Sequence, residues 1–298
     1  MDQELVSIVI PTYKRADLLP RALNSVLAQT HQNLDIIIVD DNAEFPETRE
    51  MVRRIVTETG DARISLIQNK KNLGGGPSRN AGIEASRGEY IAFLDDDDEY
   101  LPERIEKQLL CFKHSELPDL ALVYVHTAAF QDHDNQIREY RNTCRGNCVY
   151  EGMKSCIAAT SQWMCKKEAL LKVGCFSDVP CKQDSNLIVK LLVHGYCIDY
   201  VPEILSRYYL DSMTSISRQG HNKRITGEEA LRELCRQHYD MITESQQKEV
   251  EYTFACNLIH HYRALGMKEQ YHEAKRILLR HPLRRKTLGL MKYMMLNR

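Results

Sequence analysis

The sequence predicts an α/β fold with a doubly wound, mostly parallel sheet and a C-terminal helical extension. Short apolar runs rich in β-branched residues are typical of buried parallel strands, and they lie at 6–10, 36–39, 64–68 and 90–94. Helical patterns separate these runs, and strands alternating with helices indicate a parallel sheet with right-handed crossovers. After about residue 220 only helical patterns remain.

The first third of the chain contains the expected parallel strands of the sheet and the helices between them. Pro11 ends the first strand, and apolar residues then recur at helical spacing between 19 and 26. Gly74–Pro77 breaks the chain before a helix that runs to about Ser86. The expected elements up to the acidic run are strands Val6–Ile10, Ile36–Val39, Ile64–Gln68 and Tyr90–Leu94, with a helix around Thr48–Thr57.

The second half continues the sheet and then turns helical. Further strands are expected at Leu120–Val125, Trp163–Cys165, Ile198–Val201 and Leu205–Tyr209, and Ala128–Cys148 is expected to be a hairpin or a mobile flap. Expected helices are Pro102–His114, Lys167–Val173, Asp184–His194, Glu228–Tyr239, Gln246–Leu265 and Met267–Leu279. We place a soft domain boundary near Gly220, giving domains 1–220 and 221–298.

The composition, the N-terminus and the lengths of the apolar runs argue against a nucleic-acid-binding, a secreted or a membrane-spanning protein. The formal net charge is −1 over 298 residues, which does not point to nucleic acid as a partner. The ten cysteines mostly lie in apolar surroundings, as expected for reduced thiols of a cytoplasmic protein. The N-terminus does not resemble a signal peptide, and no apolar run has transmembrane length.

Four adjacent carboxylates, Asp95–Asp98, follow the apolar run Tyr90–Leu94 directly. Unpaired charges cannot continue into a core, and the four repel one another at one strand end. Mg²⁺ or Mn²⁺ with oxygen ligands relieves that repulsion and can bridge substrate phosphates. The alternative is a solvated acidic turn that caps the helix from Pro102. Because ligands collect at the carboxyl ends of parallel strands, Pro11–Arg15 and Asp40–Asn42 should lie at the same edge.

Other polar residues each allow two interpretations. Asp41 could accept from the ring N–H of a pyrimidine or cap a helix. The Gly74–Gly76 run could approach a phosphate or form a plain loop, and Arg79 could neutralise a diphosphate or pair with an acid. Asp184 opens a helix, so it could be an N-cap or a general base facing the sheet edge.

Six segments together resemble the inverting glycosyltransferases of family 2, which have the GT-A fold. The resemblance covers Val6 to about Ser217, and its segments are VSIVIPTYKRADLLPRALNSVLAQT, IIIVDDNA, NLGGGPSRNAGI, FLDDDDEYLPERI, VGCFSD with KQDSNLIVKLLVHGY, and VPEILSRYYLDSMTSIS. FLDDDDEYLPERI is similar to the family's D-x-D metal motif. KQDSNL is similar to the segment that carries its catalytic base.

The resemblance implies an enzyme that transfers a hexosyl or N-acetylhexosaminyl group from a nucleotide sugar, most simply a UDP-sugar, to a hydroxyl of a glycan or lipid-linked acceptor of a cell-surface polysaccharide. It implies Mn²⁺ or Mg²⁺ as cofactor, held by Asp97 and Asp95, and Asp184 as the catalytic base. The implied donor contacts are Pro11, Thr12, Tyr13, Arg15, Asp41, Asn72, Gly75, Arg79, Asp95 and Asp96.

The sequence departs from the family pattern in two places. Gln183 stands where an acid is common, and Tyr208 follows Arg207 where the family often has a His, with His221 a distant substitute. Two other classes stay open: a non-catalytic nucleotide-sugar-binding protein, and a sugar nucleotidyltransferase, although PTYKRAD lacks the glycines of an activating loop.

The last segment, 275–298, is basic with interleaved leucines and methionines. Such a segment can lie on an anionic bilayer surface, which would place the protein at the inner face of the cell membrane. It can equally pack on the domain as a final helix or form a homo-oligomer contact. Pro282 would divide any helix there.

Overall fold

The described strands form one sheet. The computed structural model describes residues 4–131, 135–210, 220–282, 284 and 286–290. The strand order is β3-β2-β1-β4-β8-β6-β9-β5, and β7 pairs with β6 outside this path. The strands are β1 (Val6–Thr12), β2 (Leu34–Asp40), β3 (Ile64–Gln68), β4 (Tyr90–Phe93), β5 (Glu99–Tyr100), β6 (Leu120–Gln131), β7 (Asn135–Tyr140), β8 (Trp163–Lys166) and β9 (Cys197–Tyr209).

The first four strands pair in parallel, which confirms the predicted doubly wound arrangement. In the register of β1 and β2, Thr12 lies opposite Asp40, so both strands end at the same edge. β4 pairs with β1 on its other side, and Phe93 lies opposite Val9. The acidic run after β4 therefore emerges at the edge where β1 and β2 end.

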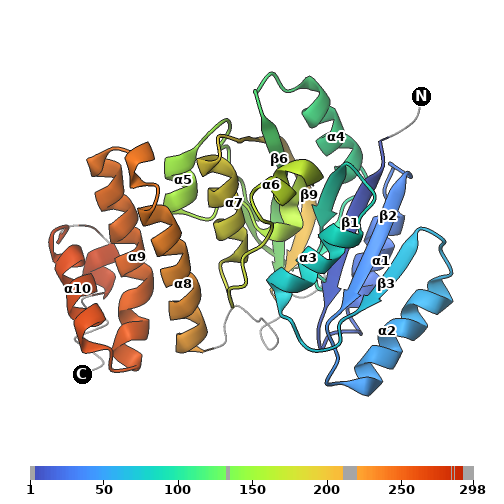
Figure 1. The fold of residues 1–298 in the computed structure, drawn as a ribbon, viewed down its shortest axis with the longest axis horizontal. Coiled ribbons are helices and arrows are strands. Elements are labelled where there is room, and N and C mark those ends of the chain that lie inside the picture. Colours follow the sequence, from blue (N-terminus) through green and yellow to red (C-terminus); the bar gives the residue numbers. More distant parts are fainter. Residues whose placement is uncertain (1–3, 132–134, 211–219, 283, 285, 291–298) are drawn as a thin grey trace.

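Helices cover the sheet, and the C-terminal helices form a bundle beside it (Figure 1). The helices are α1 (Leu19–Leu27), α2 (Pro46–Thr59), α3 (Gly75–Ala85), α4 (Arg104–His114), α5 (Val149–Lys154), α6 (Lys167–Lys172), α7 (Gln183–Val193), α8 (His221–Arg236), α9 (Glu244–Ala264) and α10 (Lys268–Leu279), with 3-10 helices η1 (Thr160–Gln162) and η3 (Tyr239–Met241). Figure 1 shows α8, α9 and α10 together at the end opposite α2, with α5 and α7 between them and the sheet.

The strands expected at 198–201 and 205–209 are parts of one strand, β9. Its register against β6 shifts between Val125, opposite Val201, and His126, opposite Ile204. Pro202 and Glu203 fall in this irregularity, where a missing backbone N–H breaks no regular pairing. Their presence split the sequence pattern into two runs. β6 continues to Gln131 and β7 returns along it, so the expected hairpin forms.

The sequence-based prediction missed several short elements and shortened one helix. β5 has two residues and α5 has six, which is too short for a periodic pattern. α8 begins at His221, before the expected start at Glu228. The prediction missed this beginning because the first turn of the helix is polar and carries no apolar periodicity.

One apolar core joins the sheet to the C-terminal helices. The same cluster of buried residues contains Phe93 of β4, Leu187 of α7, Leu231 of α8 and Phe254 of α9. The division into domains at residue 220 stays a prediction. Among the described residues, no helix combines the length and apolar character needed to cross a membrane.

Candidate active site

The polar residues after β1, β2 and β4 do meet at one edge of the sheet. Arg15, three residues beyond β1, forms an ion pair with Asp96, with Nη2 2.6 Å from Oδ1, and a second pair with Asp97. Asp96 is fully buried, and burial raises the pKa of its carboxyl to about 7 although Arg15 opposes the shift. The arginine thus offsets part of the repulsion within the acidic run.

Three of the four acidic side chains could share a cation. One carboxylate oxygen each from Asp95, Asp97 and Asp98 lies within 4.8 Å of the others. Asp98 is buried, and its Oδ1 has no hydrogen-bond partner among the described residues. Burial, and then the charges of Asp97 and Asp95, raise the pKa of Asp98 well above its usual range. Three crowded carboxylates with an unsatisfied buried oxygen fit Mg²⁺ or Mn²⁺, which take oxygen ligands.

Asp98 lies with Asp95 and Asp97, the predicted metal ligands, in the group that could hold a cation. The fourth carboxylate of the run was visible in the sequence. Its convergence with Asp95 and Asp97 was not, because strand periodicity stops at Phe93 and the turn that follows decides which side chains converge.

Arg79 connects the acidic run to the helix that carries the predicted base. From α3 its guanidinium forms an ion pair with Asp95, and Nη1 donates to Gln183 Oε1 at 3.0 Å. Gly75 leaves the room for this contact, since a Cβ there would lie 3.0 Å from Arg79 Nη1 and 3.1 Å from Gln183 Oε1. Gln183, which stands where the family commonly has an acid, therefore accepts a hydrogen bond from Arg79.

Asp184 lies in the first turn of α7. The N-cap of that helix is Lys182, in a left-handed conformation, so Asp184 does not serve as the cap. Its Oδ1 accepts from the Ser185 backbone N–H at 2.7 Å, and its Oδ2 accepts from the Cys156 thiol at 3.3 Å. The carboxylate is oriented by donors from Ser185 and Cys156. No sequence pattern predicts the Cys156 contact, which spans 28 positions of the chain.

Asp41 holds a loop of the site. Its carboxylate accepts from the backbone N–H groups of Leu73 and Gly74, each at 2.9 Å, and from Asn69 Nδ2 at 2.8 Å. Two of these bonds end on Oδ1 and one on Oδ2. Because a carboxylate has about four acceptor positions, Oδ2 keeps capacity for one more donor, such as a base N–H.

The remaining predicted donor contacts surround this edge. Tyr13 and Phe45 form an edge-to-face pair with ring centroids 5.9 Å apart, beside the point where β1 ends. Pro11 and Thr12 are the last residues of β1. Asn72 Oδ1 accepts from the Gly74 N–H at 3.0 Å and so shapes the glycine loop.

Two residues near the acidic run were absent from the prediction. Burial, and then the charges of Asp98, Asp97 and Asp95, raise the pKa of Tyr208 to about 12, which places its hydroxyl in the field of the acidic run. Ser161 Oγ accepts from the Asp95 backbone N–H at 3.1 Å. Tyr208 occupies the position where the family often has a His. His221 instead lies on α8, against α9.

The family model for glycosyl transferase family 2 matches residues 7–174. The chain belongs to this family. An uncharacterized glycosyltransferase of Methanocaldococcus jannaschii is 29% identical over 214 residues, covering 70% of this chain and 71% of the relative. The putative colanic acid biosynthesis glycosyl transferase WcaA of Escherichia coli is 43% identical over 101 residues, covering 34% of this chain and 35% of the relative. The chain therefore spans about a third of WcaA.

Solved structures confirm the GT-A-like glycosyltransferase fold. S. aureus TarS 1–349, in complex with UDP-GlcNAc, has a TM-score of 0.60 at 13% identity and covers 90% of each chain. The mannosyltransferase PcManGT of Pyrobaculum calidifontis, in complex with GDP-Man and Mn²⁺, has a TM-score of 0.61 at 17% identity, covering 98% of this chain and 79% of that one. This glycosyltransferase is therefore an α/β enzyme of a family with polysaccharide-synthesis members.

Proposed function

We propose that this enzyme is a metal-dependent, inverting glycosyltransferase that moves a sugar from a UDP-sugar to a hydroxyl of a glycan or lipid-linked acceptor during synthesis of a surface polysaccharide. The observation that carries the proposal is the double contact of Arg79. Its guanidinium touches Asp95 of the acidic run and Gln183, the neighbour of Asp184. The groups suited to the departing diphosphate and to the attacking hydroxyl are thus joined through one side chain.

The acidic run would bind the cofactor through Asp95, Asp97 and Asp98. Bound Mg²⁺ or Mn²⁺ would offset negative charge on the donor diphosphate. Arg15 and Arg79 already lie against the acidic run and can bind phosphate oxygens with their planar guanidinium groups. Positioned charges of this kind stabilise the leaving group as its bond to the sugar breaks.

Asp184 would act as general base. Its carboxylate takes the proton of the acceptor hydroxyl while the hydroxyl oxygen bonds to the anomeric carbon. The bond from that carbon to the diphosphate oxygen breaks in the same displacement, and the electron pair leaves with the diphosphate. Attack from the face opposite the leaving group inverts the configuration. The Ser185 N–H and the Cys156 thiol hold the carboxylate in one orientation.

The uridine assignment depends on Asp41. Its remaining acceptor capacity on Oδ2 suits the single ring N–H of uracil, and Tyr13 with Phe45 offers aromatic surface near the same strand ends. TarS binds UDP-GlcNAc and PcManGT binds GDP-Man. The fold therefore accommodates both bases, and residue-level contacts must decide between them.

The proposal is tested by transfer from labelled UDP-sugars with Mn²⁺ and with excess chelator, using the wild-type chain and Asp184→Asn. Asn keeps the size of the side chain and removes the base, so we expect transfer to fall about 10²–10⁴-fold, while UDP binding measured by calorimetry is retained. The matched control is Asp178→Asn, which changes an exposed aspartate. Full turnover in chelator, or near-normal turnover by Asp184→Asn, would contradict the mechanism.

A further inference from the structure

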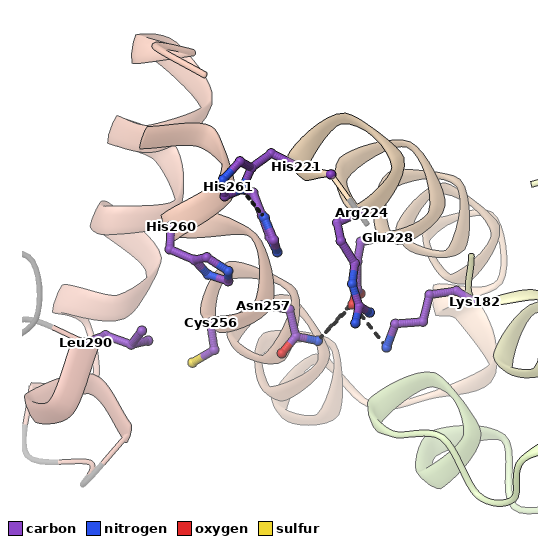
Figure 2. A pocket seen from close by; sticks show the side chains of 10 residues that line it. Lys182, His221, Arg224, Glu228, Cys256, Asn257, His260, His261 and Leu290 are labelled. Carbon is purple, nitrogen blue, oxygen red and sulfur yellow. Dashed lines mark hydrogen bonds and ion pairs between the residues drawn. The ribbon is translucent and has the colours of Figure 1, made fainter. Parts of the chain in front are cut away.

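A pocket of about 560 Å³ lies where α8 and α9 meet the turn before α7 (Figure 2). Its volume falls within the range of roughly 300–1,000 Å³ typical of pockets that bury small ligands. The polar side chains that decide its character are Lys182, His221, Arg224, Glu228, His260 and His261. None of them is used by the mechanism above.

The pocket carries a positive charge that its own residues do not neutralise. Glu228 is buried and accepts an ion pair from Lys182 Nζ at 3.0 Å, with Asn257 Nδ2 at 3.4 Å. Figure 2 shows both contacts converging on this carboxylate. Arg224 is half-buried, and no ion pair within the described part of the chain involves its guanidinium. The arginine therefore offers free donors to a ligand.

The three histidines line the same space. The Nδ1 atoms of His221 and His261 are 2.7 Å apart, so one ring donates to the other, and the His260 and His261 ring centroids are 3.7 Å apart. Burial, and then the charges of His221 and Arg224, lower the pKa of His260. Burial, and then His260, His221 and Arg224, lower the pKa of His261 to about 4. An anion in this space would relieve the positive field and accept from the rings.

The pocket lies against the turn before α7, which leads to the proposed base Asp184. Lys182 precedes Asp184 by two residues, and its ion pair reaches α8. α8 approaches this turn so closely at Gly227 that a Cβ there would lie 2.4 Å from Cys181 Sγ and 2.6 Å from Cys181 O. A molecule bound in the pocket would therefore lie beside the turn that leads to Asp184, whereas the donor diphosphate belongs with Arg79 and Asp95.

We propose that this pocket binds a phosphate group of the acceptor, which deepens the function proposed above and rests on it. Arg224 supplies a planar fork of donors that matches phosphate oxygens, and charge-assisted hydrogen bonds of this kind are strong. The imidazoles of His260 and His261 add neutral donors. The phosphate ester could belong to a phosphorylated glycan or to a polyprenyl carrier, because both present the same group to these side chains.

The first test is calorimetric titration of inorganic phosphate into the full chain in excess chelator. Loss of a hydrogen bond to a charged group should weaken binding by roughly 10–100-fold in Arg224→Gln. Arg224→Lys keeps the charge without the fork and should lose less. The matched control is Arg54→Gln, which removes an exposed arginine of α2 that pairs only loosely with Glu58, at 3.7 Å. Circular dichroism confirms that each variant is folded.

A fourth variant, Arg79→Gln, separates the pocket from the donor site. The proposal requires that Arg224→Gln weakens phosphate binding and that Arg79→Gln does not. It is overturned if phosphate does not bind, if Arg224→Gln binds as tightly as the wild type, or if only Arg79→Gln loses binding.

Two further probes distinguish the sources of the phosphate. Glycerol 3-phosphate represents a phosphorylated glycan and farnesyl phosphate a polyprenyl carrier, and at least one must bind in a manner that depends on Arg224. These assays need no turnover, so they fail independently of the proposed function. Absent transfer with phosphate binding retained would remove the glycosyltransferase mechanism, and efficient transfer without phosphate binding would remove this inference alone.

Discussion

Replacing Asp98 with Asn should stabilise the metal-free protein while weakening its binding of Mn²⁺. Carboxylate oxygens of Asp95, Asp97 and Asp98 lie within 4.8 Å of one another. Two unit charges at this separation repel by about 3 kcal/mol at an effective dielectric constant of 20. Protonation limits the cost, since holding an aspartate protonated at pH 7 costs at most about 4 kcal/mol relative to its usual pKa.

The asparagine amide at position 98 avoids the repulsion between carboxylates, but burying it has a free-energy cost of its own. A buried amide with incomplete hydrogen bonding costs about 1–3 kcal/mol. The net gain in the free energy of unfolding should therefore be about 0–3 kcal/mol, which corresponds to a rise in Tm of up to roughly 5 °C for a chain of this length.

The gain in the free energy of unfolding from Asp98→Asn should increase as the pH rises. Burial, and then Asp97 and Asp95, raise the pKa of Asp98 in the folded state. A carboxyl with a raised pKa destabilises the fold increasingly as pH rises above its usual value in the unfolded chain, about 4. The stabilisation by Asp98→Asn should thus be large at pH 7.5 and should shrink toward pH 4.

The measurement is thermal unfolding in chelator and in 1 mM MnCl₂. Wild-type protein should gain stability from Mn²⁺, by about 2.7 kcal/mol when the ion is at 100 times its Kd, and Asp98→Asn should lose most of this gain. Asp240→Asn, which changes an exposed aspartate of η3, is the control and should behave as wild type. A lower Tm of Asp98→Asn in chelator, or an unchanged response to Mn²⁺, would refute the reasoning.

Three further predictions concern the donor, the helical bundle and the tail. Calorimetry should show UDP binding more tightly than GDP, and Asp41→Asn should reduce that preference; equal affinities would remove the uridine assignment. Gly227→Ala should cost about 1–3 kcal/mol by overpacking against Cys181, measured as a lower Tm, and an unchanged Tm would show that α8 can shift. Ending the chain at Leu279 should also lower Tm, because Thr287 Oγ1 lies 2.9 Å from the Tyr252 hydroxyl and Arg284 pairs with Glu249. If segment 275–298 binds membranes, the full chain should sediment with anionic but not neutral liposomes, less so in salt; a full chain that stays in the supernatant with anionic liposomes at low salt removes that role.

The tail illustrates the limits of the sequence pattern. Its alternation of basic and apolar residues fits a membrane surface and a packed helix equally well. In the described part, Leu290 packs against the core and Thr287 is buried, which favours packing for those residues. Arg285 and residues 291–298, with the methionines and the remaining basic side chains, lie outside the described residues, as do residues 211–217 of the last family segment.

The parallel half of the fold was predictable because its signals are local. Apolar runs as continuous and rich in β-branched residues as those of β1 and β2 are typical of strands buried on both faces, and the register then places Thr12 beside Asp40. The positions of Asp41 and the acidic run followed from that edge, whereas Arg79 was assigned to the donor site from the family resemblance. The contacts of Gln183 with Arg79 and of Asp184 with Cys156 could not be predicted, since they join residues 104 and 28 positions apart. Turn geometry decides such contacts, and no periodic pattern encodes it.

The placement of α7 between the sheet and the bundle has a consequence for how this enzyme could diversify. One shared core runs from Phe93 through Leu187 to Leu231, so the helix that carries Asp184 is supported from both sides. The family model ends at residue 174, before this helix begins. Changes in α8 and α9 can therefore alter the surroundings of the proposed base without touching the strand ends that carry the proposed donor contacts. On the proposed assignment of roles, acceptor choice and donor chemistry would evolve on separate parts of a chain that shares one apolar core.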